Sequence, residues 1–88
     1  MKIEVLKFSA TWCGPCRVLA NTLKDAEGIT NIDIDKDHET PAKYGVRSVP
    51  LLVFLKDGVE VHRTSGTISL NMYNQILNEI NDSKELNK

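Results

Sequence analysis

The spacing of apolar residues in the first third of the chain predicts a strand followed by a helix. Residues 2–10 are rich in Ile, Val, Leu and Phe and contain neither Gly nor Pro, which is typical of a strand. Good helix formers follow over residues 16–26; Pro15 suits the first helical turn, and Gly28 is expected to stop the helix. The positions at helical spacing are Val18, Leu19, Thr22, Leu23 and Ala26.

The middle of the chain predicts a second strand and a short helix. Over residues 29–35, isoleucines alternate with polar residues, the pattern of a strand with one buried face. In the short helix that follows, we expect Thr40 at the N-cap, Pro41 at the first position and Gly45 at the end.

The last third predicts a hairpin and a final helix. Residues 51–55 are five consecutive apolar residues, which suit a strand buried on both faces. The turn signal at residues 56–59 returns the chain as an antiparallel strand over residues 59–64. Ser69 is expected to cap the last helix, and from about residue 82 we expect a frayed polar end. The apolar face predicted for this helix comprises Leu70, Tyr73, Ile76 or Leu77, and Ile80.

The predicted order β-α-β-α-β-β-α indicates the α/β class. Strands and helices in this order form a four-stranded mixed sheet with helices on both faces. A chain of 88 residues has room for one modest core, so residues 1–88 are expected to form a single domain, with about residues 82–88 as its tail.

Composition and charge exclude several classes of function. Apolar residues make up 41% and charged residues 26%, which is ordinary for a globular protein. The net charge of −1 provides no basic field for nucleic acid or an anionic membrane, and no apolar run approaches a membrane span. The N-terminus lacks an apolar signal region and a cleavage site, so we expect a cytoplasmic protein. We also expect it to be a monomer.

Both cysteines lie in the stretch TWCGPCR, residues 11–17, and three roles can be weighed for them. A purely structural disulfide would stabilise the fold little, because closing a four-residue loop removes little entropy from the unfolded chain. A metal site needs about four ligands, and the two histidines, His38 and His62, show no ligand spacing to the cysteines. A cluster shared between two chains stays open, but otherwise no metal is expected.

The third role, a redox pair, has a direct physical basis. Cys13 lies at a helix N-terminus, where free N–H groups and the helix dipole lower the pKa of a thiol from about 8.5 toward neutrality. Cys16 lies one turn inside the helix, within reach of a disulfide, and resolves a mixed disulfide by attacking Cys13. Gly14 gives the loop freedom and Pro15 starts the helix. Trp12 offers an apolar face to a docking partner, the alternative being a plain core tryptophan.

The motif WCGPC after an apolar strand resembles the active site of the thioredoxin family, and a second motif matches independently. It is KYGVRSVP, residues 43–50, followed by the strand LLVFL. The resemblance implies a cis bond before Pro50, which would lie against the cysteines and leave the Val49 backbone free to pair with substrate. It also implies a hairpin glycine at Gly58 and a close-packed glycine near the site at Gly66. The expected fold is therefore thioredoxin-like in its minimal form.

Three departures from the family pattern are visible. The chain begins with the strand that leads to CGPC, without the usual preceding strand and helix, and Asn21 stands where a kinking proline is usual. Lys7 occupies the strand position of a buried aspartate. A charged Lys7 would favour thiolate, and a desolvated neutral amine would act as a base, so we expect Lys7 to tune the thiols. The alternative is a lysine whose ammonium reaches solvent.

Other residues near the motifs are weaker candidates. Arg17 would steer acidic partners or be a solvated helix charge. Ser48 and Thr67 would bond a partner at the rim of the site or form turns. Asp35 would cap or orient the loop under Trp12. Tyr44 is expected to pack behind the short helix.

Together these features predict a thiol–disulfide oxidoreductase that reduces protein disulfides. The resemblance implies that a thioredoxin reductase recharges it, so that NADPH is used indirectly and no cofactor is bound. A glutaredoxin-like protein recharged by glutathione is the alternative, because Ser48, Val49 and Pro50 resemble a glutaredoxin motif; the CGPC sequence argues against it. A non-redox docking subunit on the same fold is an alternative of another class.

Overall fold

The computed structural model describes the backbone of residues 2–86 and the side chains of residues 2–82. The order of elements is the predicted β-α-β-α-β-β-α. The elements are β1 (Ile3–Ser9), α1 (Gly14–Thr22), β2 (Ile29–Asp33), α2 (Glu39–Lys43), β3 (Leu51–Lys56), β4 (Val59–Ser65) and α3 (Leu70–Leu86).

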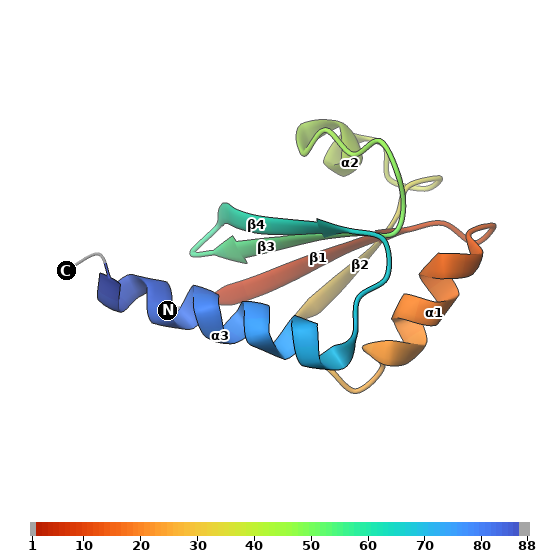
Figure 1. Cartoon of the computed structure of the whole chain (residues 1–88). Helices are drawn as coiled ribbons and strands as arrows, with labels where there is room; N and C mark the ends of the chain where they lie inside the picture. Colours follow the sequence, from red (N-terminus) through yellow and green to blue (C-terminus); the bar gives the residue numbers. More distant parts are fainter. Residues whose placement is uncertain (1, 87–88) are drawn as a thin grey trace.

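The strands of the described chain form one mixed sheet in the order β2-β1-β3-β4. β1 pairs with β2 in parallel and with β3 antiparallel, and β4 returns antiparallel along β3. The turn between β3 and β4 is tight, because Asp57 and Gly58 both adopt positive φ, at 52° and 85°. Figure 1 shows α1 and α3 against one face of the sheet and α2 on the other face. The predicted mixed sheet with helices on both faces is confirmed.

The core lies on both faces of the sheet, and β3 contributes to each. Residues 51–55 are buried without exception, as the run of five apolar residues predicts. One cluster packs between the sheet and helices α1 and α3, and comprises Val5, Leu19, Leu23, Leu52, Phe54, Tyr73, Ile76 and Ile80. The cluster on the other face comprises Leu6, Phe8, Ile32, Leu51, Val53 and Leu55. The alternation along β1 therefore places odd-numbered residues toward α1.

Helix α1 differs from its prediction in length and in one face position. It begins at Gly14 and ends at Thr22, with Leu23 as C-cap, rather than continuing to residue 26. Asn and Thr are poor helix formers, and the Thr22 hydroxyl donates to the Val18 carbonyl at 3.1 Å. Val18 itself is 58% exposed, because the buried line of this helix passes through Leu19 instead.

Helix α2 is capped by a different residue from the one predicted. The helix starts at Glu39, so Thr40 and Pro41 lie inside its first turn. Asp37 supplies the cap: its carboxylate accepts the Thr40 backbone N–H at 3.0 Å and the Thr40 hydroxyl at 2.7 Å. These hydrogen bonds lower the pKa of Asp37 below its usual range. A carboxylate competes well for a helix N-terminus because it carries charge.

Helix α3 begins as predicted. The Ser69 hydroxyl accepts the Met72 backbone N–H at 3.1 Å, which is an N-cap bond. Tyr73, Ile76 and Ile80 are buried, but Leu70 is 47% exposed because it stands at the first turn, beyond the edge of the core. The backbone is helical to Leu86. The tail expected from about residue 82 lies largely outside the described side chains, and residues 87–88 lie outside the described residues altogether.

Candidate active site

The cysteine pair lies where β1 passes into α1. Cys13 is the N-cap of the helix, with φ −94° and ψ 110°, and Pro15 occupies the first turn. Cys13 and Cys16 form a disulfide with a Cα–Cα distance of 5.3 Å. Both residues are buried, with 5% of each exposed. The helical i, i+3 spacing thus brings the two sulfurs together, as expected from the sequence.

The Cys13 sulfur is surrounded by backbone groups. The Cys16 N–H points at Cys13 Sγ over 3.2 Å, and the Val49 carbonyl oxygen lies 3.7 Å from the same sulfur. An N–H directed at sulfur favours a thiolate there, and the N-terminal end of α1 adds the positive end of the helix dipole. This environment suits an anion at Cys13.

The segment before β3 lies against the disulfide. Val49–Pro50 is a cis peptide bond, and Val49 packs on the cluster of Ala10, Cys13 and Cys16. The Pro50 carbonyl accepts the Gly66 N–H at 2.9 Å. Gly66 has φ +84°, a conformation that strains other residues. Residues 13–16 and 49–50 are therefore brought together, as the two motifs imply, and Gly66 lies beside them. A Cβ at Gly66 would meet nothing within 4 Å, so the expectation of a close-packed glycine there is wrong, and only its positive φ favours glycine.

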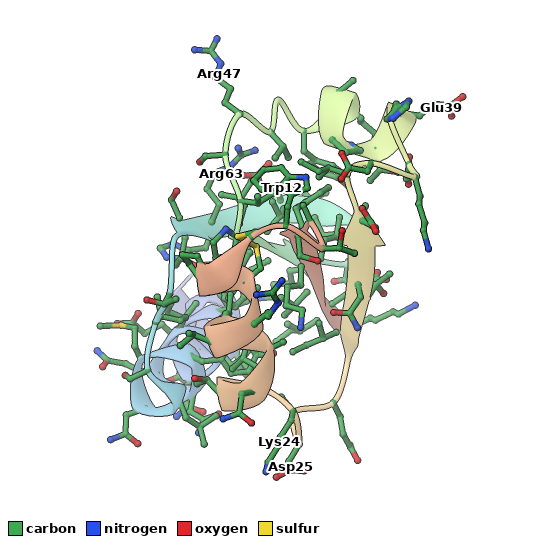
Figure 2. The ribbon with its side chains drawn as sticks, turned by 90° about the vertical axis from the view of Figure 1, so that its right-hand side faces the viewer. Trp12, Lys24, Asp25, Glu39, Arg47 and Arg63 are labelled. Carbon is green, nitrogen blue, oxygen red and sulfur yellow. A yellow bond between two sulfur atoms is a disulfide. The ribbon has the colours of Figure 1, made fainter. Side chains whose placement is uncertain are left out.

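Trp12 lies on the surface beside the cysteines. It is 66% exposed, so the core-tryptophan alternative is wrong. Its indole Nε1–H donates to Asp35 Oδ2 at 2.9 Å, which fixes the ring over the loop that follows β2. Figure 2 shows Trp12 at the end of the molecule that carries the disulfide, opposite Lys24 and Asp25. The orienting contact proposed for Asp35 is thus present.

Arg17 makes a contact that sequence reasoning missed. Its Nη2 donates to the Thr11 carbonyl at 2.8 Å, so the guanidinium ties α1 to the loop before Cys13. From the sequence alone, this residue is expected to steer acidic partners or to be a solvated helix charge. A side chain bonded to a carbonyl six residues earlier leaves no recognisable spacing signal.

Lys7 is buried beneath α1. The residue is 8% exposed, and it lines a hollow of about 310 Å³ that also reaches Cys16. No described residue makes a hydrogen bond or an ion pair with its ammonium group. Burial lowers the pKa of Lys7 below its ordinary 10.5, as expected of a desolvated cation. The other residues that line the hollow are Ser9, Ala10, Thr11, Arg17 and Ala20.

The remaining candidates are distributed around the site. The Ser48 and Ser65 hydroxyls lie 3.5 Å apart, and Thr67 is exposed beside Gly66. Tyr44 follows α2 and packs on the Phe8 ring at 6.2 Å between centroids, as expected. Within the described residues, no group of three His, Cys, Asp or Glu could hold a metal ion. None of the described helices is long and apolar enough to cross a membrane.

Comparison with known proteins places this site in a family. The family model described as Thioredoxin matches residues 1–81. The chain belongs to the thioredoxin family. Curated thioredoxins from Staphylococcus aureus and Staphylococcus epidermidis are 41% and 38% identical to it over an alignment of 71 positions. The match covers 73% of this chain and 68% of each relative.

Solved thioredoxins have the same fold. A thioredoxin from Schistosoma mansoni superposes with a TM-score of 0.79 at 30% identity, over 88% of this chain and 78% of the other. A mutant thioredoxin from Halobacterium salinarum superposes with a TM-score of 0.75 at 32% identity, over 84% of this chain and 70% of the other. The thioredoxin-like fold expected from the motifs is confirmed. With its cysteine pair at disulfide distance, this member of the thioredoxin family is a protein thiol–disulfide oxidoreductase.

Proposed function

We propose that the protein reduces disulfides of other proteins, with Cys13 as the nucleophile and Cys16 as the resolving thiol of the CGPC motif. The Cys16 N–H directed at Cys13 Sγ over 3.2 Å is the observation that supports this assignment most strongly. Cys13 attacks a substrate disulfide as a thiolate and forms a mixed disulfide. Cys16 then attacks Cys13, which releases the reduced substrate and regenerates the Cys13–Cys16 disulfide.

The substrate segment is proposed to lie across Val49 and Gly66, beside Trp12. Pro50 has no N–H and ends the strand pairing there, so the Val49 backbone is left for an extended peptide. The Val49 carbonyl lies 3.7 Å from Cys13 Sγ, which would align a substrate sulfur with the nucleophile. Trp12, two-thirds exposed and held by Asp35, supplies an apolar contact. Gly14 and Pro15 shape the loop between the sulfurs.

We propose that electrons come from NADPH through a thioredoxin reductase, and that the protein binds no cofactor of its own. The matching relatives are thioredoxins, and the family is generally reduced in this way. The whole of residues 1–88 would act as one domain, as a monomer in the cytoplasm. Its substrates would be proteins that contain disulfides, not nucleic acids or membranes.

Insulin disulfide reduction tests the proposal. The assay is run in parallel with NADPH and thioredoxin reductase, and with NADPH, glutathione and glutathione reductase. Turnover with thioredoxin reductase that disappears in a Cys13→Ser variant is the expected result. Turnover only with glutathione would replace the proposed electron donor. Turnover in neither arm, with a double Cys→Ser variant still active in cells, would identify a docking subunit instead.

A further inference from the structure

Lys7 stands in an unusual position for a charged residue. It lies in the middle of the central strand β1, opposite Asn31 on β2 and Leu52 on β3. Its side chain shares the α1 face of the sheet with Val5, and only 8% of the residue is exposed. Lysine is almost never buried to this degree unless it is paired, because desolvating an ammonium is costly. Among the described residues no anion pairs with it.

The hollow that Lys7 lines distinguishes the two sulfurs. Cys16 lines this hollow together with Lys7, whereas Cys13 does not. The Cys13 sulfur instead lies 3.7 Å from the Val49 carbonyl oxygen. At about 310 Å³ the hollow has room for several water molecules at roughly 30 Å³ each, so protons can exchange between Cys16 and solvent.

The charged groups that face the hollow leave it positive. Arg17 lines it from α1. On β3, the residue opposite Lys7 is the apolar Leu52, which brings no charge to this face. On β2, Asp33 is the cross-strand partner of Ser9. Because Ser9 lies two residues after Lys7 on β1, Asp33 is on the same face of the sheet as Lys7. Its Oδ1 accepts the Asp35 N–H at 2.9 Å, and it forms no ion pair with Lys7. Because no described residue pairs with it, the Lys7 ammonium can interact with a new anion in the hollow.

We propose that Lys7 is the counter-charge for the thiolate of Cys16, so that it acts on the resolving sulfur and not on the nucleophile. The inference rests on the proposed function and assigns its second step. Once Cys13 carries the substrate, the proton of the Cys16 thiol passes through the hollow to water. The thiolate, stabilised by the ammonium, attacks Cys13 Sγ. The Cys13–Cys16 bond forms, the bond from Cys13 to the substrate sulfur breaks, and the substrate leaves as a thiolate.

The proposal is tested on Cys16 alone, in a Cys13→Ser background where no turnover is needed. An opposite charge close by lowers a thiol pKa by about one to three units, so Lys7→Met should reduce the thiolate fraction of Cys16 at pH 7 about tenfold or more. Lys7→Gln is a second variant in case the first does not fold. Lys24→Met, at the far end of the molecule in Figure 2, is the matched control and should leave the thiolate fraction unchanged.

A second measurement separates the two chemical steps in the protein with both cysteines. Formation of the mixed disulfide should proceed at the wild-type rate in Lys7→Met, while its resolution at pH 7 should slow about tenfold and recover at alkaline pH. Equal thiolate fractions in the Cys13→Ser background would overturn the proposal. So would a slower first step with normal resolution, which would assign Lys7 to Cys13. Because the titration needs no reductase, failure of the proposed electron donor would leave it unaffected.

Discussion

The hydroxyl of Tyr73 is buried without a partner among the described residues, and its removal should make the protein more stable. Tyr73 is 1% exposed in the cluster that holds α1 and α3 on the sheet, and its ring lies 5.9 Å from that of Phe54. Its hydroxyl oxygen has no hydrogen-bond partner among the described residues. Burying an unpaired hydroxyl costs about 1–3 kcal/mol by protein mutational data. Tyr73→Phe keeps the ring, so its contact with Phe54 is retained.

We expect Tyr73→Phe to raise the free energy of unfolding by about 1 kcal/mol, because the small void left by the oxygen offsets part of the gain. For a domain of this size that corresponds to roughly 4–8 °C in Tm. Urea unfolding of the oxidised protein near pH 7 measures the change. Tyr44→Phe is the matched control: Tyr44 is half-buried beside Phe8, and its variant should differ little from wild type.

The pH dependence gives the same prediction a second test. Burial raises the pKa of Tyr73 above its ordinary 10.0, so the folded state resists ionisation of this group. The wild type should therefore lose stability as pH rises above 10.0, and the advantage of Tyr73→Phe should grow in that range. A variant less stable than wild type by about 1 kcal/mol at pH 7 would refute the reasoning, because the hydroxyl would then have a hydrogen-bond partner.

Three further predictions concern charged groups. Below the lowered pKa of Lys7, burial of its charge destabilises the folded protein, and this cost disappears as pH approaches 10.5. Oxidised Lys7→Met should therefore have a higher Tm than wild type near pH 7, and the difference in Tm should shrink toward pH 10.5. Asp35→Ala should free the Trp12 indole, which lowers its fluorescence anisotropy and raises KM for insulin about two- to fivefold with kcat unchanged. The capping bonds of Asp37 should stabilise the protein above pH 3.8, and this stabilisation should be lost as pH falls through the lowered pKa of Asp37. In thermal unfolding measured against pH, Asp37→Asn should therefore lack this loss of Tm in acid.

The elements that sequence reasoning placed well carry local signals. Five consecutive apolar residues specify β3, and Asp57-Gly58 specifies the hairpin that follows, because both residues tolerate the positive φ they adopt. Ser69 was also recognisable, since a hydroxyl directly before an apolar helix can accept a free N–H from its first turn. In each case neighbouring residues determine the geometry.

Other features depend on residues distant in the sequence. Val18 and Leu19 are equally apolar, and only the packing of α1 on the sheet determines that Leu19 is buried while Val18 is exposed. The exposure of Trp12 likewise depends on a bond to Asp35, 23 residues later. The sequence does not determine the cap of α2, because Asp37 and Thr40 are both good capping residues and only the structure shows that Asp37 accepts the free N–H.

The role of Lys7 shows how structure sharpens a sequence hypothesis. Its strand position suggested an effect on both thiols, but the helix N-terminus places them in different surroundings. Cys13, as N-cap, receives a backbone N–H and faces Val49, while Cys16 faces the cationic hollow. If Lys7 pairs with the Cys16 thiolate, the free-energy cost of burying Lys7 is offset only in the reduced protein, after the disulfide opens. Lys7→Met should then shift the dithiol–disulfide equilibrium about tenfold toward the disulfide, measured against glutathione, and an unchanged equilibrium would contradict this coupling.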